Sequence, residues 1–196
     1  MTMFKVGIIG QGRSGYSIHA DALLKMTDKY KIVAICDKLE DRRRRAEEEF
    51  GARTYENYLD MIANEELDIV VNASYSQDHF PITLDLVKKG YTVVSEKPFC
   101  ANVKEADELI KADAEYAGRI FPFQQSRFAP FYEKAKELID SGIFGRVSRI
   151  IISYGAFGRR WDWQTIKEWN AGNLKNTGPH PLDQALTFFP ENVMPK

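Results

Sequence analysis

"KVGIIGQGRSG" (residues 5–15) is the stretch that decides the fold. Its first part, "KVGIIG" (5–10), is a short apolar run that ends in glycine, which predicts a buried β-strand. "GQGRSG" (10–15) has the pattern G-x-G-x-x-G, and "YSIHADALLKM" (16–26) carries apolar residues four apart, as a helix does. A strand, a glycine-rich turn and a helix in this order are typical of a dinucleotide-binding unit.

The alternation of strands and helices continues to residue 124. We predict further strands at 31–36, 67–73, 92–96 and 119–124, and helices at 39–51, 58–64, 77–90 and 103–118. These strands are apolar on both faces, so we expect a parallel sheet with helices on both sides. The fold class is therefore α/β, with a doubly wound parallel sheet over residues 1–124.

Residues 125–196 follow a different pattern. We predict a helix at 130–145, a longer strand at 146–157, an irregular aromatic stretch at 158–178 and a helix at 181–189. Because these elements do not make a core, we expect the first part of a second, incomplete α/β domain. A strand with unpaired edges and an apolar face predicts that this part associates or is poorly ordered.

Composition excludes several classes of protein. The 196 residues have a formal net charge of −1, which gives no field for binding nucleic acid or an acidic membrane. Cys36 and Cys100 lie far apart without metal-ligand spacing, so we expect free buried thiols and no metal site. No stretch reaches the length of a membrane span, and the apolar run at the N-terminus is too short for a signal peptide. We therefore expect a cytoplasmic protein.

A run of four arginines lies in the predicted helix 39–51. Arg43, Arg44 and Arg45 are each followed by a glutamate four residues later. Residues four apart share one helix face, so we expect a solvated helix whose charges pair with one another. This interpretation is favoured over a nucleic-acid patch.

The glycine-rich turn has a specific physical reading. Gly10 makes the tight turn, Gly12 lets the backbone approach a diphosphate, and Gly15 lets the helix pack on the strand. Asp37 ends the next predicted strand, 22 residues after Gly15, and would accept hydrogen bonds from the adenosine ribose. A carboxylate there favours NAD over NADP, although Lys38 beside it weakens that preference. The alternative is a glycine turn that binds no ligand.

Glu96, Lys97 and Pro98 follow the buried strand that contains Val93 and Val94. Parallel sheets present functional groups at the carboxyl ends of their strands, so Lys97 would reach the nicotinamide end of a dinucleotide. The alternative for this tripeptide is a surface salt bridge.

Five motifs together resemble one family, the Gfo/Idh/MocA oxidoreductases, named after glucose–fructose oxidoreductase and inositol dehydrogenase. The motifs are "VGIIGQGRSG", "AICD", "SEKPFC", "FQQSRFAPFYEKAKELIDSGIFGRV" and "NTGPHPLDQAL", and the resemblance covers nearly the whole chain. It implies a Rossmann domain followed by an open-sheet α/β domain, and NAD(P) chemistry on sugars, cyclitols and related polyols. It also implies a longer chain than this one and a homo-oligomer, a dimer or a tetramer.

The resemblance implies catalytic residues as well. Lys97 matches the catalytic lysine of the family and His180 its catalytic histidine. Asn176 stands where many members have an aspartate, and Asp183 is then the remaining carboxylate near His180. His180 would take the hydroxyl proton of the substrate, while Lys97 would stabilise the developing negative charge on the same oxygen. Asn176 and Asp183 would orient His180 or other substrate hydroxyls.

We assign the remaining candidate residues to the cofactor site. The histidines His19 and His79 lie near helix starts, where capping or packing is the commoner role of a lone histidine, but we include His79. The predicted cofactor-binding residues are Gly10, Gly12, Arg13, Ser14, Gly15, Asp37, Lys38, Ser74, Tyr75, His79, Glu96, Lys97 and Gln125.

Other readings stay open. A non-catalytic, NAD(P)-binding sensor or regulator on the same scaffold would explain Asn176, and NAD-dependent glycoside cleavage is a further reaction that this scaffold could carry out. Trp161, Trp163 and Trp169 either line a sugar site or form the core of their own loop; we favour the second reading slightly.

Overall fold

The structure is a computed structural model that describes residues 3–155 and 157–189. The chain divides into two compact units, residues 1–123 and residues 124–196. A helix needs about 20 apolar residues to cross a bilayer, and no helix in the described ranges meets that requirement.

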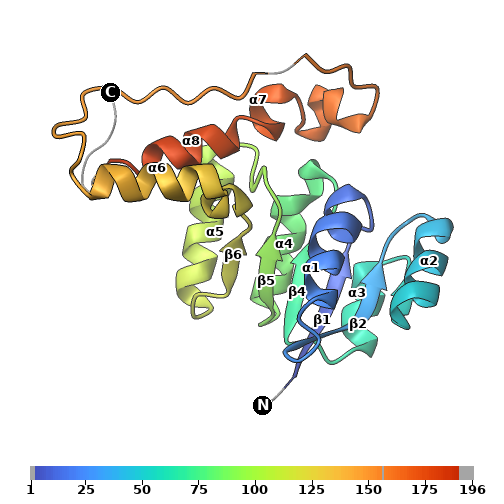
Figure 1. Cartoon of the computed structure of the whole chain (residues 1–196). Coiled ribbons are helices and arrows are strands. Elements are labelled where there is room, and N and C mark those ends of the chain that lie inside the picture. The colour runs from blue at the N-terminus through green and yellow to red at the C-terminus, as the bar shows by residue number, and fades with distance from the viewer. Residues whose placement is uncertain (1–2, 156, 190–196) are drawn as a thin grey trace. The chain divides into compact units, whose positions relative to one another are not determined.

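The first unit contains a six-stranded sheet in which all pairs of neighbouring strands are parallel (Figure 1). The strand order is β3-β2-β1-β4-β5-β6. The strands are β1 (Phe4–Ile9), β2 (Tyr30–Cys36), β3 (Arg53–Tyr55), β4 (Ile69–Asn72), β5 (Thr92–Ser95) and β6 (Ile120–Pro122). The order reverses at β1, and such a reversal opens a crevice at the carboxyl ends of the strands where ligands bind in this class of fold.

Helices connect these strands. They are η1 (Gly15–Ala20), α1 (Asp21–Leu24), α2 (Glu40–Phe50), α3 (Tyr58–Asn64), η2 (Ser76–Asp78), α4 (His79–Lys88) and α5 (Val103–Glu115). The sheet carries two apolar clusters, one with Val6 and Ala46 and the other with Ile9, Met61 and Leu86. Val6 and Ile9 are three residues apart and therefore point to opposite faces of β1. The sheet is thus covered on both faces, which confirms the doubly wound Rossmann fold.

Two local features of the first unit differ from the sequence prediction. β3 is a sixth strand that pairs with β2 at the edge of the sheet. It has only three residues and no apolar run, so the sequence pattern gives no sign of it. The helix after the glycine-rich turn begins with a π-helical segment, η1, before the short α1.

Helices are the only regular secondary structure in the described part of the second unit. They are η3 (Gln125–Phe128), α6 (Pro130–Asp140), η4 (Trp163–Thr165), η5 (Lys167–Trp169), α7 (Asn173–Asn176) and α8 (Pro179–Leu186). Tyr132 and Ala171 are its buried apolar residues in the described ranges, whereas Ile151 and Trp161 are exposed. The association expected for this unit stays a prediction.

The strand predicted at 146–157 is wrong. Residues 146–155 and 157 have no regular structure, and residue 156 lies outside the described residues. Alternating apolar residues make a strand only where another strand supplies hydrogen-bonding partners. No described segment of the second unit is a strand, so this segment has nothing to pair with.

Candidate active site

The glycine-rich turn leaves no room for side chains at two of its positions. Gly10 has a φ of +89°, and a Cβ there would lie 2.3 Å from the carbonyl oxygen of Ala73. A Cβ on Gly15 would lie 1.8 Å from the carbonyl oxygen of Gly10. Both contacts are with backbone atoms, which cannot move aside as a flexible side chain can. The turn therefore brings the start of the first helix close to the end of β1.

Gly12 is different, because a Cβ there would meet only Arg42 Nη1, at 3.7 Å. Folding therefore does not exclude a side chain at this position, and the open space fits the close approach of a diphosphate. Next to it, Gln11 is 1% exposed and neither atom of its amide has a partner among the described residues. A backbone turn with space at Gly12, beside a buried amide without a partner among the described residues, fits a polar ligand such as a dinucleotide. In the same turn, Arg13 is exposed and Ser14 is half-buried.

Asp37 is buried just after β2 and is tied to the glycine-rich turn. Its Oδ2 accepts hydrogen bonds from the backbone N–H of Gln11 at 2.7 Å and from Arg42 Nη1 at 3.2 Å. Its Oδ1 accepts from the backbone N–H of Leu39 at 2.9 Å. The carboxylate therefore fixes the turn, and its contact with an adenosine ribose stays a prediction. Lys38 is exposed.

The predicted pairing of Arg43, Arg44 and Arg45 with the glutamates four residues later is wrong, although one pair of charges within α2 does form. Arg43 donates to the carbonyl oxygens of Asp37 and Lys38, and Arg44 pairs with Asp41, three residues before it. Arg45 lies 3.7 Å over the ring of Tyr16. Long side chains on a helix lean toward its N-terminus, so an arginine meets groups that precede it rather than a glutamate four residues later. Arg45 also donates to the carbonyl oxygen of Gln11 at 3.2 Å, so its guanidinium group lies beside the glycine-rich turn.

His79, at the start of α4, holds together the loops that follow β4 and β5. Its ring is 2% exposed, with Nδ1 2.8 Å from the carbonyl oxygen of Pro98 and Nε2 3.1 Å from that of Ser74. Burial lowers the pKa of His79, although the two carbonyl contacts oppose that shift. Beneath it, Asn72 Nδ2 donates to the His79 carbonyl and to Thr83 Oγ1, both at 3.1 Å. Both loops are thus fixed by buried polar contacts.

Ser74 and Tyr75 belong to the loop after β4. Ser74 Oγ donates to Asn72 Oδ1 at 2.7 Å, and both Ser74 and Tyr75 are half-buried. They lie where the first unit presents the ends of β1 and β4, which is the position predicted for cofactor-binding residues.

Glu96 is a buried carboxylate beside the proposed catalytic lysine. Its Oε1 lies 3.2 Å from His19 Nε2, and its Oε2 accepts a hydrogen bond from the backbone N–H of Lys97 at 3.2 Å. Burial opposes ionisation of Glu96, but the contact with His19 and the charge of Lys97 hold its pKa below the ordinary value. The ring of His19 also packs against Phe123, with centroids 4.4 Å apart. Glu96 thus links the first helix to the turn that carries Lys97.

In the second unit, His180 lies in the first turn of α8. Its Nδ1 is 3.1 Å from Oε1 of Gln124, and Gln124 Nε2 donates to the carbonyl oxygen of Pro179 at 2.8 Å. Asn176 ends α7 and is half-buried. Gln125, predicted at the cofactor site, begins η3, and its Oε1 is buried without a partner among the described residues.

Asp183 also lies in α8, one turn after His180, but its two oxygens bind another residue. Arg127 donates to Asp183 from Nε and from Nη2, each at 2.7 Å. Two parallel bonds of this kind are the strongest arrangement of an arginine and a carboxylate. The hydrogen bonds to Asp183 raise the pKa of Arg127 further, so Arg127 stays charged.

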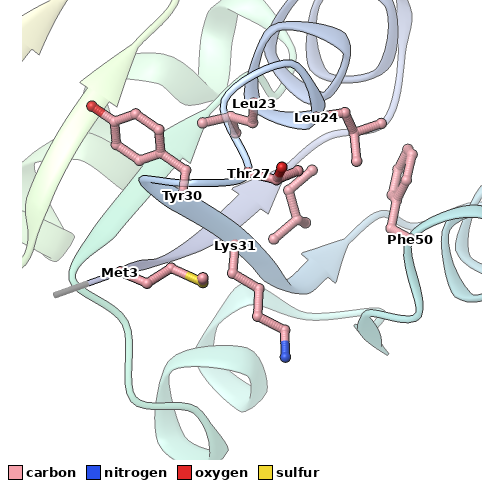
Figure 2. Close-up of a pocket in the computed structure, with 8 residues that line it drawn as sticks. Met3, Leu23, Leu24, Thr27, Tyr30, Lys31 and Phe50 are labelled. Carbon is pink, nitrogen blue, oxygen red and sulfur yellow. The ribbon is translucent and has the colours of Figure 1, made fainter. Parts of the chain in front are cut away.

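A pocket in the first unit is lined by residues that differ from the predicted site residues of that unit. Leu23, Leu24, Tyr30 and Phe50 line it with Met3, as Figure 2 shows, and its volume is about 270 Å³. Tyr30 is the first residue of β2, so the pocket lies at the amino ends of the strands. Its lining residues include none of the predicted site residues.

Sequence reasoning missed Gln124, Asn72 and Arg127. Gln124 and Asn72 stand at the carboxyl ends of predicted strands, the same kind of position that marks Lys97. That signal was available, but an amide is a weaker chemical marker than an amine or an imidazole. Arg127 carries no such signal, because its partner is 56 residues away.

Two family models match the chain. The model described as "Oxidoreductase family, NAD-binding Rossmann fold" matches residues 4–123, and the "GFO/IDH/MocA C-terminal domain" matches residues 132–194.

Individual proteins are similar over much of the chain. An inositol 2-dehydrogenase/D-chiro-inositol 3-dehydrogenase of Lactiplantibacillus plantarum is 30% identical over 72% of this chain and 41% of its own length. A crystal structure of an NAD-binding protein from Listeria innocua has a TM-score of 0.85 and 25% identity, covering 98% of this chain and 56% of that one. The crystal structure of the WlbA dehydrogenase from Bordetella pertussis, in complex with NADH and UDP-GlcNAcA, has a TM-score of 0.69 and 30% identity. The match covers 74% of this chain and 44% of that one. The chain spans about half the length of the curated relatives that it matches.

Proposed function

Because this chain belongs to the Gfo/Idh/MocA oxidoreductase family, whose N-terminal model covers residues 4–123, we propose that it acts as an NAD(P)-dependent dehydrogenase. The reaction is oxidation of a CH–OH group in a sugar, cyclitol or related polyol. In this proposal residues 1–124 form the NAD(P)-binding domain. Residues 125–196 form the first part of the substrate-binding and oligomerisation domain.

The observation that carries the proposal is the cradle formed by Gly10, Gly12 and Gly15. The close packing at Gly10 and Gly15 leaves the space at Gly12 open, and the helix that follows offers backbone N–H groups to a diphosphate. Asp37 is proposed to bind the adenosine ribose, which favours NAD. Arg42 contacts Asp37, and Lys38 follows Asp37 in the sequence. Because these two cations could accept a 2′-phosphate, NADP is the second cofactor to titrate.

The chain's own residues divide the chemistry between them. When bound, NAD(P) supplies the acceptor for the hydride of the carbinol carbon. His180 is the proposed base that takes the hydroxyl proton, a contribution of roughly 10²- to 10⁴-fold in rate. Lys97 is proposed to donate a hydrogen bond to the same oxygen as its negative charge develops. Asn176 is proposed to bind another hydroxyl of the substrate, since its amide both donates and accepts.

Substitution of Lys97 tests this proposal. Lys97→Ala should abolish turnover of polyols while NADH still binds, because the cradle lies in the turn after β1. Lys104→Ala changes an exposed lysine on α5 and is the matched control. Unchanged turnover in Lys97→Ala would refute the role of Lys97.

A second candidate is a non-catalytic, NAD(P)-binding regulator. The observation in its favour is that Asp183 is engaged by Arg127 and that position 176 holds a neutral amide. A screen of sugars and cyclitols with NAD distinguishes the two candidates. Tight NADH binding without reduction of NAD by any substrate supports the regulator.

The cytoplasmic location and a homo-oligomer, a dimer or a tetramer, remain predictions from the sequence. Size-exclusion chromatography with light scattering measures the oligomeric state directly.

A further inference from the structure

The side-chain amide of Gln124 contacts two consecutive residues of α8. Gln124 Nε2 donates a hydrogen bond to the carbonyl oxygen of Pro179 at 2.8 Å, and Gln124 Oε1 lies 3.1 Å from Nδ1 of His180. A carbonyl oxygen only accepts, so the first contact requires the NH₂ group of the amide to face Pro179. The amide oxygen of Gln124 therefore faces the imidazole.

This orientation determines where the imidazole carries its proton. The amide oxygen of Gln124 also only accepts, so Nδ1 of His180 must be the donor in the second contact. A neutral imidazole has one N–H group, and its other nitrogen then holds a lone pair. With Nδ1 protonated, the basic nitrogen of His180 is Nε2.

A carboxylate often orients a catalytic histidine, and Asp183 is the carboxylate predicted for this task here. Both oxygens of Asp183 accept hydrogen bonds from Arg127, at 2.7 Å each. Position 176, where many members of the family have an aspartate, is asparagine. The contact at Nδ1 comes instead from a residue near the end of β6.

We propose that Gln124 is a positioning residue that holds the neutral form of His180 with its proton on Nδ1, so that Nε2 is the atom that accepts the substrate proton. This inference deepens the proposed function and rests on it for the role of His180. The tautomer itself is a property of this chain and does not depend on turnover.

Nuclear magnetic resonance of the ring nitrogens tests the proposal directly. The chain has three histidines, so a long-range ¹H–¹⁵N spectrum is simple, and His180→Phe identifies the signals of His180. The measurement is made at a pH above the titration of the ring. We expect a protonated Nδ1 and an unprotonated Nε2 in the unaltered chain.

Three variants separate orientation by Gln124 from other causes. Gln124→Leu removes the acceptor, and the ratio of the Nδ1–H to the Nε2–H tautomer should fall about five- to tenfold, the effect of one lost hydrogen bond. Gln124→Glu keeps an oxygen at this position and should keep the Nδ1–H tautomer. Asp183→Asn should leave the tautomer unchanged, because Asp183 binds Arg127.

The outcomes decide the proposal without any enzyme assay. An Nε2–H tautomer in the unaltered chain overturns it, as does a Gln124→Leu variant with the tautomer ratio of the unaltered chain. Loss of the Nδ1–H tautomer in Asp183→Asn also overturns it, because the orienting group would then be Asp183. A chain that shows the expected tautomers but oxidises no polyol supports this inference while contradicting the proposed function.

Discussion

Replacing Gly12 by alanine should separate cofactor binding from folding. A Cβ at Gly12 has Arg42 Nη1 as its nearest neighbour, at 3.7 Å, an ordinary contact, and the φ of Gly12 is not in the left-handed range. The free energy of unfolding should therefore change by about 1 kcal/mol or less. The added methyl group fills space proposed for the diphosphate, and overpacking of this kind costs about 1–3 kcal/mol. That cost corresponds to a Kd for NADH that is about 5- to 150-fold higher.

Gly15→Ala should have the opposite signature. Its Cβ would lie 1.8 Å from the carbonyl oxygen of Gly10, about half of an ordinary contact distance, so the turn itself must move. We expect a loss of about 3 kcal/mol or more in the free energy of unfolding. For a protein of this size that is a fall of roughly 6–12 °C in Tm.

Two measurements on the same variants check these expectations. Circular dichroism gives Tm, and quenching of intrinsic fluorescence by NADH gives the Kd. Gly158→Ala is the control, because no heavy atom lies within 4 Å of the added Cβ. The reasoning fails if Gly12→Ala binds NADH as tightly as the unaltered chain, or if Gly15→Ala melts at the same temperature.

Three further expectations concern the same molecule. His19 holds the pKa of Glu96 below its ordinary value of 4.5, so the contribution of Glu96 to stability is complete above pH 4.5 and disappears as the pH falls below that value. Urea denaturation between pH 7 and pH 3 should therefore show a loss in the free energy of unfolding that the Glu96→Gln variant lacks. A double-mutant cycle of Arg127 and Asp183, measured by urea denaturation, should give a coupling free energy of about 1 kcal/mol, because the pair is bidentate but partly exposed. A coupling free energy of zero would contradict the contact. Burial raises the pKa of the Cys36 thiol to about 12, so iodoacetamide at pH 8 should modify it only after unfolding, as mass spectrometry can show.

Much of the first unit could be predicted from local patterns. The apolar runs of β1, β2, β4 and β5 are long enough to be recognised as strands, and each is followed by a segment with the spacing of apolar residues typical of a helix. β3 could not be found this way, because three residues carry too little pattern and pairing with β2 alone defines it. The segment 146–157 shows the reverse error, since an apolar pattern without a pairing partner does not make a strand.

The site could be predicted less completely, because its chemistry depends on contacts distant in sequence. The glycines and Lys97 are marked by local motifs. The engagement of Asp183 by Arg127 and the contact of Gln124 with His180 join residues 56 apart, and no local pattern encodes them. The arginines of α2 were misjudged for a related reason: spacing along a helix shows which residues are neighbours, but not which way a long side chain leans.

The central position of β1 has a consequence for biosynthesis. β1 leaves the ribosome before both of its neighbours in the sheet, β2 and β4, which end at Cys36 and Asn72. Translation adds about 5–20 residues per second, so the nascent chain carries an unpaired apolar strand for some seconds. During that interval Val6 and Ile8, fully buried in the finished sheet, are accessible to chaperones.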